Sequence, residues 1–111
     1  MRTLNLKEDM PTVPVAMARL ERELALANSS RIAVVKIIHG YGSTGRGGDI
    51  RVAVQKALVE RAQSGAIQAV IFGEDWRISN ETTWALIKKW PELKQDSDLG
   101  RENKGITIVV L

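Results

Sequence analysis

Residues 37–49 read Ile37-Ile38-His39-Gly40-Tyr41-Gly42-Ser43-Thr44-Gly45-Arg46-Gly47-Gly48-Asp49, and this stretch decides the fold. An apolar run over residues 31–38 leads into it, and an amphipathic run begins at Ile50 directly after it. The pattern predicts a buried strand, a glycine-rich loop and the start of a helix, with Asp49 as the helix N-cap. Five of the nine glycines of the chain fall between Gly40 and Gly48.

This loop has the composition of an anion-binding site. Glycine allows a positive φ and lets a ligand approach the main chain closely. Successive N–H groups ahead of a helix N-terminus attract anions, and two arginines add full positive charge. We therefore expect a phosphate-bearing partner to bind the following residues: Gly40, Tyr41, Gly42, Ser43, Thr44, Gly45, Arg46, Gly47, Gly48 and Arg51.

The composition limits the classes of protein that need to be considered. With 111 residues the chain is long enough for a single domain with its own core. A net charge of +3 and a pI of about 9.5 favour an anionic partner only mildly. The absence of cysteine excludes disulfides and thiolate zinc sites, and a single histidine excludes a multi-histidine metal site. Because no signal peptide or membrane-spanning pattern is visible, we expect a cytoplasmic protein with no membrane partner.

Outward from the loop, the apolar periodicity predicts an α/β domain in which strands and helices alternate. Residues 3–7 alternate with one polar face, which is typical of an edge strand. Residues 31–38 are apolar on both faces except at Lys36, as in an interior strand. We predict strands at 3–7, 31–38, 66–72 and 105–111, and helices at 13–28, 50–64 and 80–90.

The first two predicted helices would cover one face of the sheet, which leaves a second apolar face in need of cover. The helix at 80–90 and a second subunit, and hence a homodimer, are the two candidates. We interpret Trp76, Trp84 and Trp90 as core or interface side chains. Charges of both signs mix around this helix, as on a solvated surface: Lys88, Lys89, Glu92, Lys94, Asp96, Asp98, Arg101, Glu102 and Lys104.

Three segments resemble the small MutS-related domain, usually called the Smr domain. Residues 35–42 look like the His-Gly-x-Gly signature of that family, and residues 105–111 are similar to its closing strand. Leu4-Asn5-Leu6-Lys7 stands where the family carries Leu-Asp-Leu followed by Arg or His. The resemblance covers nearly the whole chain apart from the part between the third and last strands.

The resemblance implies one Smr-like domain over residues 1–111, with an insertion at about 73–103. The implied fold is an α+β two-layer sandwich with a four-stranded mixed sheet, similar to the C-terminal domain of translation initiation factor three. In that fold the last strand lies antiparallel between the second and the third. Family members bind DNA or RNA, and several nick or cleave it. The resemblance therefore implies nucleic-acid binding that includes Lys7, and it leaves open an endonuclease acting in DNA repair or recombination.

His39 and Asn5 are the candidate catalytic residues that the resemblance implies. His39 either contacts a phosphate and moves a proton, or hydrogen-bonds loop carbonyls and holds the turn. Asn5 replaces the aspartate of the family, and an amide neither acts as a base nor binds a divalent cation with full charge. Glu8 and Asp9 follow closely and are possible substitutes. We expect binding with weak or no cleavage and no certain cofactor, with a divalent cation needed only for nuclease activity.

Two other interpretations remain open. Residues 40–45 also fit the G-x-G-x-x-G pattern of dinucleotide-binding proteins and follow a predicted strand. However, residues 46–48 lengthen that turn, and Glu60 falls inside a helix rather than at the end of a strand. The other interpretation is a non-catalytic module that dimerises through its exposed apolar face.

The role expected of Tyr41 depends on the interpretation. If nucleic acid binds, the Tyr41 ring stacks on a base, and otherwise it packs against the loop.

Overall fold

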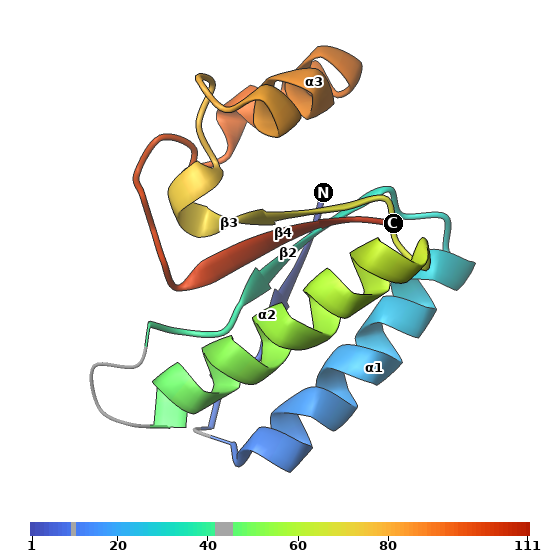
Figure 1. The fold of residues 1–111 in the computed structure, drawn as a ribbon, viewed down its shortest axis with the longest axis vertical. Coiled ribbons are helices and arrows are strands. Elements are labelled where there is room, and N and C mark those ends of the chain that lie inside the picture. The colour runs from blue at the N-terminus through green and yellow to red at the C-terminus, as the bar shows by residue number, and fades with distance from the viewer. Residues whose placement is uncertain (10, 42–45) are drawn as a thin grey trace.

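Four strands form one sheet at the centre of the molecule, with helices on both of its faces (Figure 1). The computed structural model describes residues 1–9, 11–41 and 46–111, and of residues 46 and 47 it describes the backbone alone. The elements in chain order are β1 (Arg2–Asn5), α1 (Val13–Ser29), β2 (Val34–Ile38), α2 (Arg46–Ser64), β3 (Ala69–Phe72), the 3-10 helix η1 (Gly73–Asp75), α3 (Glu81–Lys89), the 3-10 helix η2 (Pro91–Gln95) and β4 (Ile106–Val110).

The strand order is β1-β2-β4-β3, so the last strand of the chain lies in the interior of the sheet. β1 pairs parallel with β2, whereas β4 pairs antiparallel with both β2 and β3. The predicted four-stranded mixed sheet is therefore confirmed, including the antiparallel position of the closing strand between the second and the third. β1 is an edge strand with alternating exposure, as its sequence pattern predicted.

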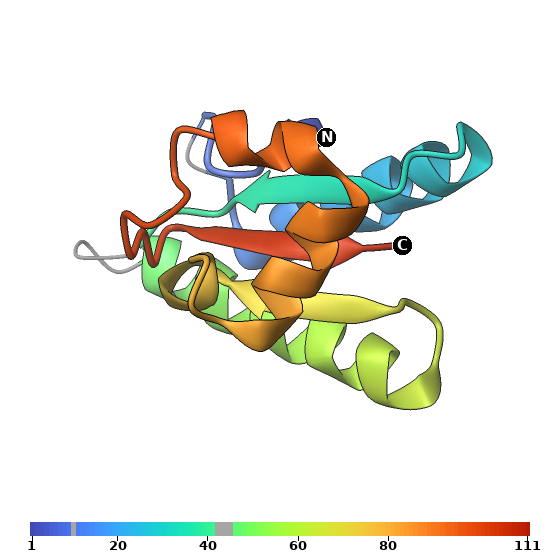
Figure 2. The same ribbon diagram turned by 90° about the horizontal axis from the view of Figure 1, so that it is seen from above.

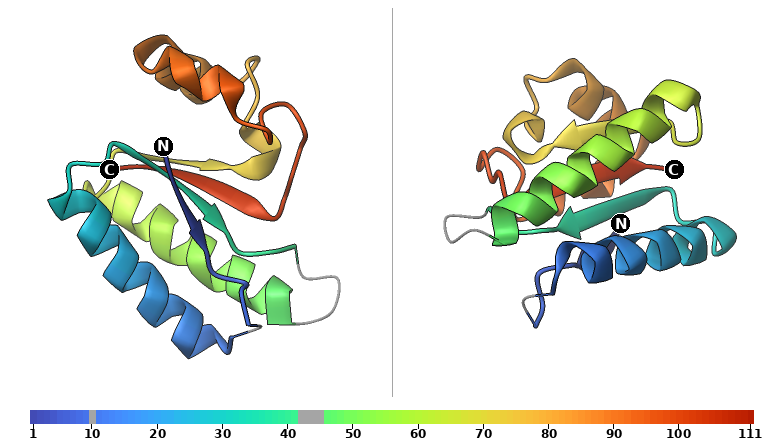
Figure 3. Two further views of the ribbon diagram at one scale, coloured as in Figure 1. Left: turned by 180° about the vertical axis from the view of Figure 1, so that it is seen from behind. Right: turned by 60° about the horizontal axis from the view of Figure 1, so that its bottom comes forward.

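Helices α1 and α2 lie side by side across one face of the sheet (Figure 3). The Thr12 side chain caps α1 by accepting a hydrogen bond from the Val15 amide at 3.4 Å. The predicted apolar stripes face inward, and Leu20 of α1 and Leu58 of α2 are fully buried. None of the helices in the described part of the chain is long and apolar enough to cross a membrane.

The opposite face of the sheet is covered by η1, α3 and η2, which cross the strands in the view from above (Figure 2). Their apolar side chains form a second core with the strands, centred on the fully buried Trp76. Trp90, directly after α3, packs against this core, in agreement with its interpretation as a core or interface side chain, whereas Trp84 stays 39% exposed. Of the two candidates for covering this face, the helix at 80–90 and a second subunit, the helix therefore provides the cover within one chain.

The structure moves the starts of α2, β2 and β3, and it ends β1 at Asn5 rather than at residue 7. Helix α2 begins at Arg46 and places Asp49 in its first turn, so Asp49 is not the N-cap and residues 46–48 do not belong to the loop. Strand β2 begins later than residue 31 because Arg31 has φ of +58° and the amide of Ile32 bonds to a carbonyl of α1. β3 begins at Ala69 rather than at residue 66 for the same reason, because the Ala66 amide donates a hydrogen bond to the Arg61 carbonyl of α2.

A buried ion cluster fixes the 73–103 segment to the sheet. Lys36 of β2 is 5% exposed, and its Nζ lies 3.0 Å from Asp96 Oδ1 and also pairs with Asp98. Trp76 Nε1 donates to Asp96 Oδ2 at 2.9 Å. Burial lowers the pKa of Lys36, but its hydrogen bonds to Asp98 and Asp96 outweigh that effect and raise its pKa above 10.5. The single polar side chain in this apolar strand is therefore a charged anchor.

The same cluster extends to the start of β4. Asn103 Nδ2 donates to Asp98 Oδ1 at 2.9 Å, and Asn103 Oδ1 accepts from the Gly105 amide at 2.8 Å. The Asn103 backbone also lies close to Gly73, where only a glycine fits, because a Cβ on Gly73 would lie 1.7 Å from the Asn103 carbonyl oxygen. The position of residues 104 and 105 is therefore fixed by contacts with the 73–103 segment.

We predict that Lys36→Met lowers the free energy of unfolding by about 3–5 kcal/mol, because it leaves two largely buried carboxylates without their cation. Urea unfolding followed by circular dichroism measures the change. The control is Arg2→Met, which removes an ion pair with Glu23 in which Arg2 is 39% exposed, and should cost less than about 1 kcal/mol. Equal losses in the two variants would contradict the anchoring role of Lys36.

Candidate functional site

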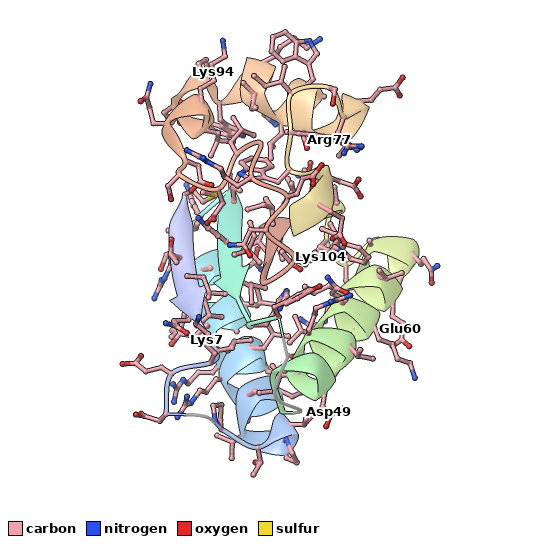
Figure 4. The ribbon with its side chains drawn as sticks, turned by 90° about the vertical axis from the view of Figure 1, so that its left-hand side faces the viewer. Lys7, Asp49, Glu60, Arg77, Lys94 and Lys104 are labelled. Atoms are coloured by element: carbon pink, nitrogen blue, oxygen red, sulfur yellow. The ribbon has the colours of Figure 1, made fainter. Side chains whose placement is uncertain are left out.

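The candidate site lies where the carboxyl ends of β1 and β2 meet the start of β4 and the first turns of α2. Parallel pairing brings the ends of β1 and β2 together, with Asn5 opposite Ile38. The antiparallel pairing of β4 places Ile106 opposite Ile38 from the other side. In Figure 4 Lys104 lies between the 73–103 segment and Asp49, and Lys7 lies near the end of β1. Four elements thus meet at one edge of the sheet.

Gly40 and Gly105 bring two backbone segments into close approach at this edge. The amides of His39 and Gly40 both donate to the Gly105 carbonyl oxygen at 3.1 Å. Gly40 has φ of +83°, a conformation that side chains with a Cβ rarely adopt. Because its amide is engaged within the protein, Gly40 contributes the turn itself rather than a free donor.

Tyr41 lies in the middle of the site and is 55% exposed. The Arg51 Cζ atom of α2 and the Lys104 Nζ atom each lie 5.9 Å from the centroid of the ring. At that distance a cation is attracted by the negative face of the ring. Two cations from distant parts of the sequence therefore converge on one solvent-exposed aromatic side chain.

Lys7 and Asn5 border the site from the edge strand. The stem of Lys7 passes beside Gly40, because a Cβ added to Gly40 would lie 3.6 Å from Lys7 Cδ. The exposed Asn5 accepts a hydrogen bond from the Lys7 amide at 3.0 Å through its Oδ1. Asn5 thus holds the turn after β1 and places Lys7 beside the glycine turn.

The two carboxylates that follow Lys7 are exposed and line a depression together with Asn5 and Glu23. Glu8 accepts a hydrogen bond from Arg19 through its backbone carbonyl at 3.1 Å, and Asp9 lies in a turn with φ of +64°. Within the described ranges, no group of three or more histidine, cysteine, aspartate or glutamate side chains is arranged to hold a metal ion.

His39 is completely buried and both of its ring nitrogens have partners. Nδ1 lies 2.8 Å from the Gly40 carbonyl oxygen, which can only accept, so Nδ1 carries a proton. Nε2 lies 2.8 Å from Thr107 Oγ1 and accepts from that hydroxyl in the neutral ring. Thr107 Oγ1 in turn accepts from Gln55 Nε2 at 3.3 Å. This chain of hydrogen bonds satisfies a neutral His39 and links β2, β4 and α2.

The environment of His39 also favours its neutral form. Burial lowers the pKa of His39 below its usual value of 6.5, and the positive charge of Arg51 lowers it further. The hydrogen bond to the Gly40 carbonyl and the charge of Glu74 act in the opposite direction without reversing the shift. Of the two roles considered for His39, proton transfer at a phosphate and holding the turn, the hydrogen bond to the Gly40 carbonyl corresponds to the second.

Several expected binding residues belong to the loop and to the first turn of α2. Gly42, Ser43, Thr44 and Gly45 lie outside the described residues. Helix α2 includes the backbone of Arg46, Gly47 and Gly48, and Gly48 is partly buried. The first amides of an α-helix have no partner within the helix, so this turn has the donors that an anion requires.

Lys104, Gln55, Thr107 and Glu74 belong to the site but were not among the expected site residues. Lys104 was assigned to a mixed, solvated surface because charges of both signs surround it in the sequence. A signal was nevertheless present, since an antiparallel closing strand beside β2 brings the residue before Gly105 next to the loop. The sequence contained no corresponding signal for Gln55 or Glu74, whose contacts depend on packing.

One feature of the structure supports the dinucleotide interpretation and another argues against it. Because α2 begins at Arg46, the turn after β2 is not lengthened by residues 46–48. However, β4 separates β2 from β3, whereas a dinucleotide-binding unit has the two strands around its helix as parallel neighbours. Glu60 lies within α2, away from any strand end, as expected.

The titration of His39 can be followed directly because it is the only histidine. We predict a neutral ring protonated at Nδ1 at pH 7, with a pKa below 6.5, in a two-dimensional NMR titration of the ring nitrogens. The unfolded chain binds a proton near pH 6.5 and the folded chain only at lower pH, so the free energy of unfolding falls as the pH drops below about 6.5. A ring that titrates at or above 6.5 would contradict this.

Comparison with known proteins supports the fold. The sequence matches no model of a known protein family, and no curated protein matches it. The structure resembles the crystal structure of the Smr domain of MutS2 from Thermus thermophilus, with a TM-score of 0.61 and 17% sequence identity. The match covers 100% of this chain and 98% of that chain. The chain therefore has an Smr-like fold, in agreement with the resemblance of its sequence motifs.

Proposed function

We propose that this protein binds nucleic acid through the surface formed by Lys7, Gly40, Tyr41, Arg51 and Lys104, called here the Tyr41 site. The observation that carries the proposal is the convergence of Arg51 and Lys104, from α2 and from the start of β4, on the exposed ring of Tyr41. An exposed aromatic ring between cations suits a base together with its phosphates.

The charges around the Tyr41 site favour an anionic polymer. Lys7, Arg51 and Lys104 come from three different elements, and such a cluster attracts phosphate by releasing its counterions. Arg51 Nε is buried and has no hydrogen-bond partner among the described residues. The acidic residues here are Asp49, in the first turn of α2 with an exposed side chain, and the partly buried Glu74, whose charge acts on His39.

The Smr-like fold supports the same class of partner. The motifs around residues 4–7 and 35–42 resemble a family whose members bind DNA or RNA, and the overall structure resembles an Smr domain. Binding of DNA or RNA is therefore the function on which the motifs, the fold and the charges agree.

We propose binding without efficient cleavage. His39 has no exposed surface, and its neutral ring is fully engaged with Gly40 and Thr107, so it is poorly placed to exchange protons with a bound phosphate. Asn5 supplies an amide where the family's nucleases are thought to need a carboxylate. Glu8 and Asp9 are exposed, and within the described residues they belong to no group of three or more histidine, cysteine, aspartate or glutamate side chains arranged to hold a metal ion.

We predict that Arg51→Ala and Lys104→Ala each weaken binding to DNA and RNA of any sequence. Each variant should reduce the slope of log affinity against log salt concentration by about one unit, because one phosphate contact is lost. Fluorescence anisotropy over a range of salt concentrations measures both quantities.

The matched control for this experiment is Lys56→Ala. Lys56 is an exposed cation on the same helix as Arg51, but five residues further along, which turns it by about 140° around the helix axis. It should leave the affinity and the salt slope nearly unchanged. Salt-insensitive binding, or equal effects of Lys56→Ala and Arg51→Ala, would contradict the Tyr41 site.

Cleavage is tested by restoring the missing carboxylate. Asn5→Asp keeps an oxygen that can accept from the Lys7 amide, so it should preserve the turn after β1. We predict little or no nicking by the natural protein in the presence of Mg²⁺ or Mn²⁺, and more by the Asn5→Asp variant. Strong cleavage by the natural protein, absent from an identically purified His39→Ala sample, would overturn the proposal of binding without cleavage.

A further inference from the structure

Trp84 differs from the other two tryptophans of the chain. Trp76 is fully buried and Trp90 packs against the second core, so both stabilise the fold. Trp84 is 39% exposed, while its helix turns Leu86 and Ile87 toward the sheet. Trp84 is not among the side chains packed against the second core, so the exposed part of its ring is open to another use.

Positive charge accompanies the exposed ring. Lys94 Nζ, from η2, lies 5.8 Å from the centroid of the Trp84 ring. Lys88 follows Trp84 by four residues on α3, so the two exposed side chains are neighbours on the helix surface. Glu81 is the acidic residue one turn before Trp84. The ring therefore has lysines on the η2 side and toward the helix C-terminus.

The structure holds this surface in a fixed position. The Asn80 side chain caps α3 by accepting from the Thr83 amide at 3.1 Å, and Thr83 Oγ1 donates to the Asp75 carbonyl at 2.7 Å. The Lys36 cluster joins the end of η2 to the sheet through Asp96. A preorganised aromatic surface loses little conformational freedom when it binds.

The surroundings of Trp84 favour a nucleic-acid strand over a protein partner. Stable protein interfaces need more than about 1,000 Å² of complementary surface with an apolar centre. Two apolar depressions in this part of the molecule border Trp90, and neither includes Trp84. An isolated ring flanked by lysines instead matches one stacked base with its adjacent phosphates.

We propose that Trp84, Lys88 and Lys94 form a second contact surface for single-stranded nucleic acid. A base stacks on the exposed indole of Trp84, and the two lysines contact the phosphates beside that base. This inference rests on the proposed function, because the same strand also occupies the Tyr41 site. It extends the contact to the 73–103 segment.

The distance between the two surfaces gives the proposal a length dependence. In Figure 4 Lys94 lies at the end of the molecule formed by the 73–103 segment, and Lys104 lies toward the middle. The molecule measures 36 Å along its longest axis, which limits the span that a bound strand must bridge. A strand of about 4 nucleotides therefore occupies only the Tyr41 site, where Lys7, Arg51 and Lys104 gather, whereas one of about 16 nucleotides has the length to reach both surfaces.

The experiment compares full-length variants by fluorescence anisotropy with single-stranded DNA of these two lengths. Trp84→Ala should weaken binding of the long strand roughly tenfold or more, which is the loss expected for one stacked base, and should leave the short strand nearly unaffected. Trp84→Phe keeps an aromatic face and should retain most of the affinity. Lys94→Gln should lower the salt slope for the long strand by about one unit. Leu26→Ala, at an exposed apolar position on α1, is the control and should change neither strand's affinity.

The outcomes separate this inference from the proposed function. If Arg51→Ala and Lys104→Ala weaken binding but Trp84→Ala does not, the second surface is wrong and the Tyr41 site stands. An equal loss for both strand lengths would also overturn the second surface. If neither Arg51→Ala nor Lys104→Ala affects either strand, the proposed function itself fails. Should Trp84→Ala unfold, the exposed Lys94→Gln variant decides, and an unchanged salt slope overturns the proposal.

Discussion

The buried pairing of Lys36 with Asp96 and Asp98 is the interaction on which the second face of the sheet depends. A lysine in the apolar interior is tolerated only with charged partners, and both partners belong to the 73–103 segment. The ion pairs with Lys36 thereby attach the 73–103 segment to the sheet, and they also hold the core around Trp76 in place. Because Asp98 also bonds Asn103, the same interaction determines where β4 begins and where the Tyr41 site is assembled.

The elements that depend on local sequence could be predicted, and those that depend on distant contacts could not. Apolar periodicity predicted all three α-helices and all four strands, whereas the N-caps at Thr12 and Asn80 are findings of the structure. The interior position of β4 does not follow from periodicity, and only the resemblance to a known family implied it. The starts of β2 and β3 were predicted too early, because the amides of the apolar residues that follow α1 and α2 donate hydrogen bonds to carbonyls of those helices.

The candidate site shows the same division. Gly40 and Tyr41 were identified because a glycine cluster after a strand has a local chemical meaning. Lys104 was missed because its role depends on pairing with a strand far away in the sequence. His39 could be located but its state could not, since the neutral ring depends on burial and on Thr107, 68 residues further along the chain.

The interior position of β4 has a consequence for the order in which the protein folds. The strands β2 and β3 cannot join into one sheet until the final strand lies between them, so the central pairings close only across long stretches of chain. Such non-local pairing slows folding and leaves apolar strand edges open while it is incomplete. Residues 2–64 contain the helices α1 and α2 and the parallel strand pair β1 and β2. This part of the chain would therefore form an incomplete sheet until β4 pairs with β2 and β3.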